Sequence, residues 1–361
     1  MNPRLGIAAV LASCGIALVV AGCSKSTGTN PLPSPTPVTS AGPDTVYVDT
    51  VSSGSGSVRV YKGGSTDNSI VNPVATLSTN EGSQPDVVYS PLFDVLWVPA
   101  AYPQQSFTGP LPTPIRVWTS ASTRTSADSP MLVPYTDGAG AAVYDSVHDL
   151  LYVANIDGPT IDIYASAHLM TPASTPAARI TLTITDGSIL NPRPIEMALD
   201  DRSAGGRLFV SDEGAVVAVF NGFATIAANA AASHTNTTVP ANQEISGLFQ
   251  PDGLAYSAGN DILYVGEHNS RQIDVVHSAS TFNGPVGHSQ VINNFAGGAP
   301  TGLAYDGVRD LLFVYEPGVG IDVIPNPGVA SGNVNAIANK RTFFDSLVAL
   351  SGFGIAVDTT H

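Results

Sequence analysis

The stretch PDGLAY at residues 251–256 decides the fold, because it opens a motif that the chain writes more than once. It is followed by DILYV at 261–265 and then by IDVV at 273–276. The same three elements return in the same order as PTGLAYD at 300–306, LLFV at 311–314 and IDVI at 321–324. Self-similarity at a long and nearly constant period indicates one supersecondary unit that is copied around or along an axis.

Three landmarks extend this unit over most of the chain. A short apolar run follows a Pro or Gly, a second run places an aromatic residue before Val, and a third run alternates apolar and polar residues. The second-run aromatics, 49 to 57 residues apart, are Tyr47, Trp97, Tyr152, Phe209, Tyr264 and Phe313. A looser fourth run follows, as at 75–77, 179–182 and 290–292. Four short strands in each unit and a period near 50 predict an all-β propeller with four-stranded antiparallel blades.

The two ends of the repeat region predict how the ring closes. The chain enters at TVYV (45–48), a second-strand motif, and leaves at FGIAVD (353–358), a first-strand motif. We therefore expect residues 353–358 to complete the sheet built by 45–84, which gives six blades and a propeller domain over 45–361. Closure removes the exposed sheet edges of an open array. No segment keeps a convincing helical period, so the Ala-rich stretch 224–232 is expected to be a loop insertion in blade four.

Composition limits the classes of partner. Of 361 residues, 43% are apolar and only 12% are charged, and the net charge is −15. Binding to nucleic acid needs clustered Lys and Arg, so this balance argues against a nucleic-acid partner. It also argues against electrostatic docking on an anionic membrane.

The first 22 residues have the anatomy of a secretory signal, with Arg4 before an apolar run. The stretch VAGC at 20–23 resembles a bacterial lipobox, which implies cleavage before Cys23 and acylation of its thiol. The alternative is an ordinary signal peptide cut near Ala21. Cys14 would leave with the signal, so Cys23 would be the one thiol of the mature chain. Ser24 after the cysteine resembles the pattern of lipoproteins sorted to the outer membrane.

Residues 23–44 are expected to form the lipidated cysteine and a tether. This segment is rich in Pro, Ser and Thr and has too few large apolar residues to fold. Proline-rich chain is semi-rigid, and its reach would be on the order of 60 Å. We therefore predict three parts, a signal over 1–22, a tether over 23–44 and the propeller over 45–361, held in a bacterial cell envelope by a lipid bilayer.

The repeat at 251–275 resembles an NHL repeat, and the architecture of 45–358 is similar to the six-bladed propellers of the SMP-30/gluconolactonase group. The resemblance implies a binding mouth on one face of the ring. It implies no single function, because the group includes lyases, lactonases and pure interaction modules.

Four polar residues follow the second-strand aromatics by three positions, namely Asn155, Asp212, Glu267 and Glu316. Equivalent positions of a propeller form a ring at one end of the tunnel. Oxygen ligands of this kind suit Ca²⁺ or Mg²⁺, and the similar lactonases use a Glu/Asn/Asp set around the tunnel. The alternative is that these side chains cap the backbone of the turns that they begin.

Glu196 is a further candidate ligand or base. It lies within a first strand, where we align it with Val88, Val143, Leu254 and Leu303 of other blades. A carboxylate in a tunnel-lining strand is costly unless it is paired or hydrated. The seven histidines occupy positions that are not equivalent, and no pair has metal-ligand spacing, so all are expected to be surface imidazoles.

A long segment between the second and third strands of blade two, residues 99–112, carries Tyr102 and Phe107. Aromatics in a long loop at a binding face are typical of a recognition element. The alternative is a loop that folds back over Trp97 or Trp118.

These observations favour a binding module for a protein, peptide or glycan on the envelope, with Ca²⁺ or Mg²⁺ as the candidate cofactors. A divalent-metal-dependent lactonase or hydrolase, using the four polar residues, is the first alternative. A structural envelope lipoprotein is the second.

Overall fold

The computed structural model separates into two units, residues 1–37 and 38–361. It describes residues 44–52, 55–79, 86–100, 114–135, 137–183, 194–212, 214–296, 298–343, 354–358 and 360. The predicted signal, Cys23 and nearly all of the tether lie outside the described residues. The long segment with Tyr102 and Phe107 also lies outside them.

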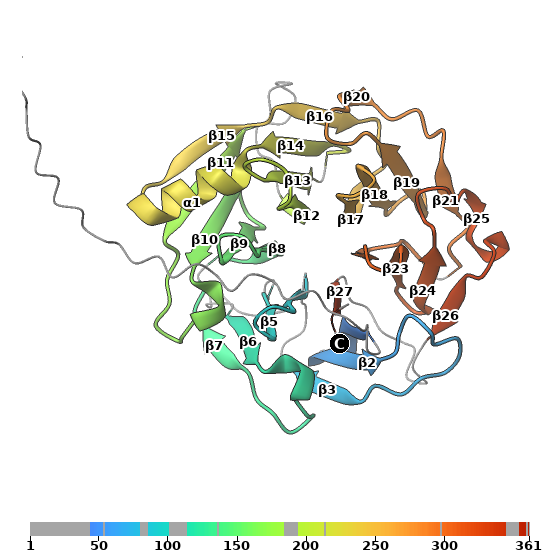
Figure 1. The fold of residues 1–361 in the computed structure, drawn as a ribbon, viewed down its shortest axis with the longest axis horizontal. Helices are drawn as coiled ribbons and strands as arrows, with labels where there is room; N and C mark the ends of the chain where they lie inside the picture. The colour runs from blue at the N-terminus through green and yellow to red at the C-terminus, as the bar shows by residue number, and fades with distance from the viewer. Residues whose placement is uncertain are drawn as a thin grey trace, which may run out of the picture. The chain divides into compact units, whose positions relative to one another are not determined.

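Six sheets surround a common axis, as the sequence predicts, and the four inner strands of each are antiparallel (Figure 1). From the axis outward, blade 1 contains β27 (Ile355–Asp358), β1 (Thr45–Ser52), β2 (Ser55–Lys62) and β3 (Ala75–Ser78). Blade 2 contains β4 (Val88–Ser90), β5 (Val95–Val98), β6 (Ile115–Thr119) and β7 (Met131–Val133). Blade 3 contains β8 (Ala139–Asp145), β9 (Leu150–Asn155), β10 (Thr160–Ala165), β11 (Ala178–Thr183) and β15 (Thr237–Pro240).

The second half of the ring follows the same order. Blade 4 contains β12 (Pro194–Asp200), β13 (Arg207–Asp212), β14 (Val217–Asn221), β16 (Gln243–Ser246) and β20 (Gly284–Pro285). Blade 5 contains β17 (Pro251–Ser257), β18 (Ile262–Glu267), β19 (Gln272–His277), β21 (Val291–Asn293) and β25 (Gly332–Asn333). Blade 6 contains β22 (Gly302–Asp306), β23 (Leu311–Glu316), β24 (Gly320–Pro325) and β26 (Arg341–Phe343).

The predicted closure is confirmed. Strand β27 pairs antiparallel with β1, and Ala356 lies opposite Tyr47. The innermost strands contact one another in the ring order β27, β4, β8, β12, β17, β22 and back to β27. Blades 5 and 6 approach so closely here that a Cβ on Gly253 of β17 would lie 2.8 Å from the carbonyl oxygen of Thr301. The ring thus brings equivalent positions of the repeat around one axis.

The aromatic landmarks hold the blades together. All six second-strand aromatics are fully buried. Four of them pack face to face or tilted against a first-strand tyrosine of the next blade, as Trp97 does on Tyr144 with ring centroids 4.9 Å apart. The buried apolar residues fall into six clusters, one at each junction between neighbouring blades. Periodic aromatics in the sequence therefore mark the inter-blade core.

Fifth strands cover the outer edges of blades 3, 4 and 5. Each comes from the next blade and runs parallel to the fourth strand, as β15 does along β11. Side chains complete the cover, as when Asn236 accepts from the N–H of Arg179 at 2.9 Å. Blade 2 instead has Pro130 and Pro134 on either side of β7. Because proline has no N–H, these residues blunt an edge that could otherwise pair with another chain.

The prediction of a loop at 224–232 was wrong. Helix α1 spans Phe223–Ser233 and packs across blades 3 and 4. Its first residue, Phe223, meets Tyr152 edge to face at 5.4 Å, at the junction where blade 4 has Leu199 in place of the tyrosine. The tertiary contact supplies the stability that an Ala-rich segment of this length lacks alone. No helix among the described residues is long and apolar enough to cross a membrane.

Candidate functional site at the mouth of the axis

The four predicted ring residues end their second strands, and the side chains of Asn155, Asp212 and Glu267 accept hydrogen bonds from nearby groups. Asn155 accepts from the N–H of Asp157 at 2.8 Å. Asp212 accepts from the N–H groups of Gly214 and Val216 at 2.8 and 3.3 Å. These contacts are the turn capping that the sequence offered as the alternative to metal binding.

Glu267 is fully buried at the end of β18. One carboxylate oxygen accepts from the N–H of Phe249 at 2.8 Å, and the other accepts from the hydroxyl of Ser270 at 2.5 Å. Burial raises the pKa of Glu267, while these two hydrogen bonds oppose the rise. The carboxyl of Glu316 is also buried at the end of β23. Whether these four residues form a divalent-metal site stays a prediction.

Glu196 belongs to a different ring from the one that we predict. It lies opposite Ser211 in the β12–β13 pair, after a bulge, and two residues before Ala198, the partner of Phe209. The positions two residues before the partner of each second-strand aromatic are Gly354, Asp86, Ala141, Glu196, Gly253 and Gly302. The alignment with Val88, Val143, Leu254 and Leu303 was therefore out of register, because each of these residues follows the true equivalent of Glu196 in its blade by one or two positions.

Asp86 is the second carboxylate of this inner ring, and the sequence did not single it out. Both Asp86 and Glu196 are buried, with 6% and 8% of their surface exposed. Asp86 accepts from the N–H of Val87 at 2.6 Å and from the N–H of Ala142 in the next blade at 2.8 Å. Glu196 accepts from the N–H of Met197 at 2.9 Å. In the described part of the chain neither carboxylate forms an ion pair.

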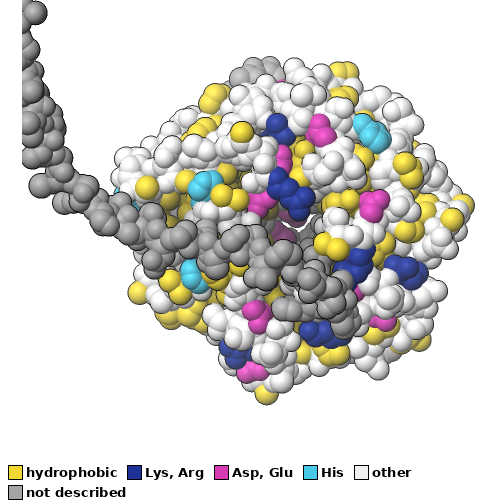
Figure 2. All heavy atoms as spheres, viewed as in Figure 1, with side chains coloured by type: hydrophobic (Ala, Val, Ile, Leu, Met, Phe, Trp, Pro, Cys, Tyr) yellow, Lys and Arg dark blue, Asp and Glu magenta, His cyan; other side chains and the backbone are white. Residues whose placement is uncertain are grey.

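The electrostatics show that these two acids share one space. Burial raises the pKa of Asp86 to about 7, against two backbone hydrogen bonds that lower it. Burial also raises the pKa of Glu196 well above its usual value, and the charges of Asp86 and Asp252 raise it further. Asp86 acts on Glu196 although blade 3 separates their blades, because both first strands line the axis. Figure 2 shows a hollow at the centre of the ring with acidic and basic side chains at its edge.

Asp252 extends the acidic site to blade 5. Its carboxylate lies 2.6 Å from Nδ1 of His268, whose side chain is 47% exposed. Exposed Phe249 lies in the connection between blades 4 and 5, and the next residue, Gln250, accepts a hydrogen bond at 2.9 Å from Asn269 in the turn between β18 and β19. We call Asp86, Glu196 and Asp252 the axial acids.

A second ring of buried charge lies farther from the axis, on the third strands. The equivalent positions, each paired with the Val after a second-strand aromatic, are Arg59, Arg116, Asp162, Ala218, Asp274 and Asp322. Each acid of this ring meets a basic side chain from the outer part of its own blade. Arg179 contacts Asp162 at 2.7 Å, His288 contacts Asp274 at 2.9 Å, and Lys340 contacts Asp322 at 2.8 Å.

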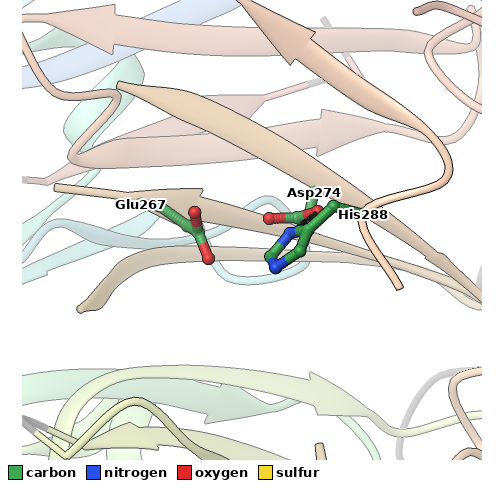
Figure 3. Close-up of side chains that lie close together, drawn as sticks. All are labelled: Glu267, Asp274 and His288. Atoms are coloured by element: carbon green, nitrogen blue, oxygen red, sulfur yellow. Dashed lines mark hydrogen bonds and ion pairs between the residues drawn. The ribbon is translucent and has the colours of Figure 1, made fainter. Parts of the chain in front are cut away.

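One group of acids and histidines in the described residues is compact enough to hold a metal ion: Glu267, Asp274 and His288 (Figure 3). Its Asp274–His288 contact is the blade 5 version of the ion pair that Arg179 and Lys340 make in blades 3 and 6. The repeat therefore favours an ion pair over a cation site. The side chains of His148, His168, His268 and His288 are 26–47% exposed, in line with the expected surface imidazoles, and each ring also contacts an aspartate, which the sequence does not predict.

Comparisons with known proteins support the fold. No protein-family model matches the chain, and no curated protein matches it in sequence. A chain of the crystal structure of a nidogen/laminin complex is similar in structure, with a TM-score of 0.53 and 10% identity. The similarity covers 89% of this chain and 100% of that one. At this identity the similarity shows the propeller fold alone.

Proposed function

We propose that this chain is an exported, lipid-anchored binding module of NHL-like type that takes a cationic group of a peptide or protein ligand at the axial acids. The observation that carries the proposal is the pair Asp86 and Glu196, two buried carboxylates that have backbone donors but no cationic partner among the described residues. A buried carboxylate is costly without a counter-charge. A ligand ammonium or guanidinium would supply one.

The rest of the mouth fits recognition better than catalysis. Side-chain oxygens at three of the predicted ring positions accept hydrogen bonds from backbone N–H groups, namely those of Asn155, Asp212 and Glu267. A solved propeller with the same architecture is part of a complex between two proteins. Exposed Phe249 beside the mouth provides an aromatic contact of the kind that anchors protein partners.

Binding can be tested on the purified full-length chain with peptides that carry one Lys or one Arg on a neutral background, read by fluorescence anisotropy. We expect binding that weakens with salt and that falls at least about tenfold in the Asp86→Asn/Glu196→Gln variant. The matched control is Asp128→Asn/Glu244→Gln, which removes two carboxylates from outer positions. Equal binding by the axial variant and the control would disprove the proposed ligand chemistry.

A divalent cation is the second candidate for the same acids, because carboxylate pairs also suit Ca²⁺ and Mg²⁺. It corresponds to the metal-dependent lactonase or hydrolase. Thermal melting with CaCl₂, MgCl₂ and chelator separates the two, since an ion bound only by the native state raises the melting temperature. A rise that the axial variant abolishes would favour the cation over the peptide.

The anchor forms a separate part of the proposal. VAGC at 20–23 supports acylation of Cys23 and attachment to the envelope membrane. Labelling cells with an alkyne fatty acid should tag the wild type, and Cys23→Ser should lose both the label and the membrane fractionation. A labelled Cys23→Ser protein would contradict this part alone.

A further inference from the structure

The His288 ring lies between two hydrogen-bond acceptors in blade 5. Its Nδ1 is 2.9 Å from a carboxylate oxygen of Asp274, and its Nε2 is 3.0 Å from the carbonyl oxygen of Gly247. Figure 3 shows the ring beside Asp274, with the Glu267 carboxylate facing the pair. An ionised carboxylate and a backbone carbonyl can only accept, so both ring nitrogens must donate. Only the protonated imidazolium has two N–H groups.

The other blades independently indicate a cation at this place. The acids equivalent to Asp274 are Asp162 and Asp322, and they meet Arg179 and Lys340. Both of those partners are permanent cations at physiological pH. Blade 5 alone fills the role with a side chain that titrates near neutrality.

The charged groups around His288 are all acidic. Asp274 faces it from β19 and Glu267 from β18, and the ring of Phe249 stacks against it at 5.4 Å. Gln272 adds a distant amide at 3.5 Å. Burial lowers the pKa of His288, but the hydrogen bond and charge of Asp274, the charge of Glu267 and the Gly247 carbonyl outweigh it, so the pKa is raised.

We propose that His288 is a pH-sensitive brace that, as an imidazolium, fastens the connection 246–250 between blades 4 and 5 onto blade 5. A neutral ring keeps one N–H, so deprotonation turns either the Asp274 or the Gly247 contact into two facing lone pairs. The brace is complete below the ordinary histidine pKa and is lost as the pH rises through the raised pKa of the folded state. The connection carries Phe249 and leads into Asp252, so its release alters the mouth whatever the mouth binds.

The chemistry of a metal ion at the same residues is different. A coordinated imidazole has given up the proton on its ligating nitrogen, so it cannot donate to both Asp274 and Gly247. The protonation state of His288 therefore distinguishes the brace from a cation site.

The first test uses NMR on the ¹⁵N-labelled full-length chain. We expect His288 to show two protonated ring nitrogens at pH 6 and to titrate above the ordinary histidine range. A neutral tautomer at pH 6 would overturn the proposal. A shift of the His288 signals on addition of ZnCl₂, reversed by chelator, would overturn it in favour of a metal site.

The second test measures amide hydrogen exchange of 246–250 at pH 6 and pH 9, corrected for the intrinsic exchange rate. We expect protection to fall roughly tenfold at pH 9 in the wild type, as loss of one hydrogen bond implies. His288→Arg and His288→Lys copy the other blades and should keep protection at both values. His288→Gln should lose it at both, while His277→Gln, at an exposed histidine of the same blade, should behave as the wild type. A pH-dependent loss in His288→Arg equal to that of the wild type would refute the brace.

Discussion

This propeller buries carboxylates in two places, one on the third strands and one beside the axis. The two sets differ in whether a basic side chain contacts the carboxylate. Asp162, Asp274 and Asp322 on the third strands are at most 1% exposed, and each has a cation from its own blade. Asp86 and Glu196, at the start of the first strands, are nearly as buried, yet among the described residues they accept hydrogen bonds only from backbone N–H groups. A carboxylate matched by a cation serves the fold. A carboxylate left with its charge unmatched beside the axis has a place for a partner from outside.

Opening the ring should have the largest effect, because both sets of carboxylates are positioned by blades that close around an axis. Deletion of residues 354–361 removes β27, the innermost strand of blade 1, and exposes β1 and the apolar junction with blade 6. We expect the chain to unfold or aggregate, since an unpaired buried edge also leaves its polar groups unsatisfied.

Circular dichroism and size-exclusion chromatography measure this effect. Deletion of residues 359–361 alone keeps β27 and is the matched control, for which we expect little change. A 354–361 deletion that melts with the control would refute the role of closure.

Removing a cation from the outer set should have the next largest effect. Lys340 is 12% exposed and contacts Asp322, which is fully buried. Lys340→Met leaves that carboxylate without its counter-charge, and breaking a buried pair from one side costs about 3–5 kcal/mol. Urea denaturation at pH 7 should show this loss, and Lys340→Arg should restore most of the stability.

The control for this variant is Lys62→Met, at the end of β2, where no ion pair forms within the described residues. A Lys340→Met chain as stable as Lys62→Met would mean that Asp322 does not depend on its cation. The distinction between the two sets of carboxylates would then fail.

The sequence predicts the ring well because short local motifs identify which strand of a blade each segment forms. Each second-strand aromatic precedes Val and faces the inter-blade core, so Trp97 or Tyr264 can be recognised without coordinates. The closing strand could be predicted because the terminal motifs are the first and second strands of one sheet.

The sites could not be predicted to the same degree, because they depend on register and on pairs that lack a fixed spacing. Glu196 lies in the ring of Asp86 because each precedes the partner of a second-strand aromatic by two residues, and nothing in the local pattern signals that register. The basic partners follow their aspartates by different intervals, because the chain after the third strand differs in length between blades, so the sequence does not relate His288 to Arg179. Helix α1 is stabilised by a contact between Phe223 and Tyr152 of another blade, which no local pattern shows.

The smallest effect concerns the axial set and is expected in the pH dependence of stability. The carboxyl of Asp86 has a pKa of about 7 in the folded chain against 3.8 for the free side chain. The folded state thus binds a proton that the unfolded state has released, so stability falls as the pH rises from about 4 to about 8. Between pH 5 and pH 8 this difference in pKa corresponds to roughly 3 kcal/mol. Urea midpoints at pH 5 and pH 8 should differ accordingly.

Replacing both axial carboxyls by neutral amides tests whether they cause this pH dependence of stability. Asp86→Asn/Glu196→Gln cannot ionise at the axis, so its urea midpoint should change less between pH 5 and pH 8 and should exceed that of the wild type at pH 8. Asp128→Asn/Glu244→Gln should keep the slope of the wild type. If the axial variant keeps that slope too, the charge of Asp86 and Glu196 is already balanced in the folded chain. The axial acids would then belong with the paired aspartates of the third strands, and the argument for a cationic ligand would lose its basis.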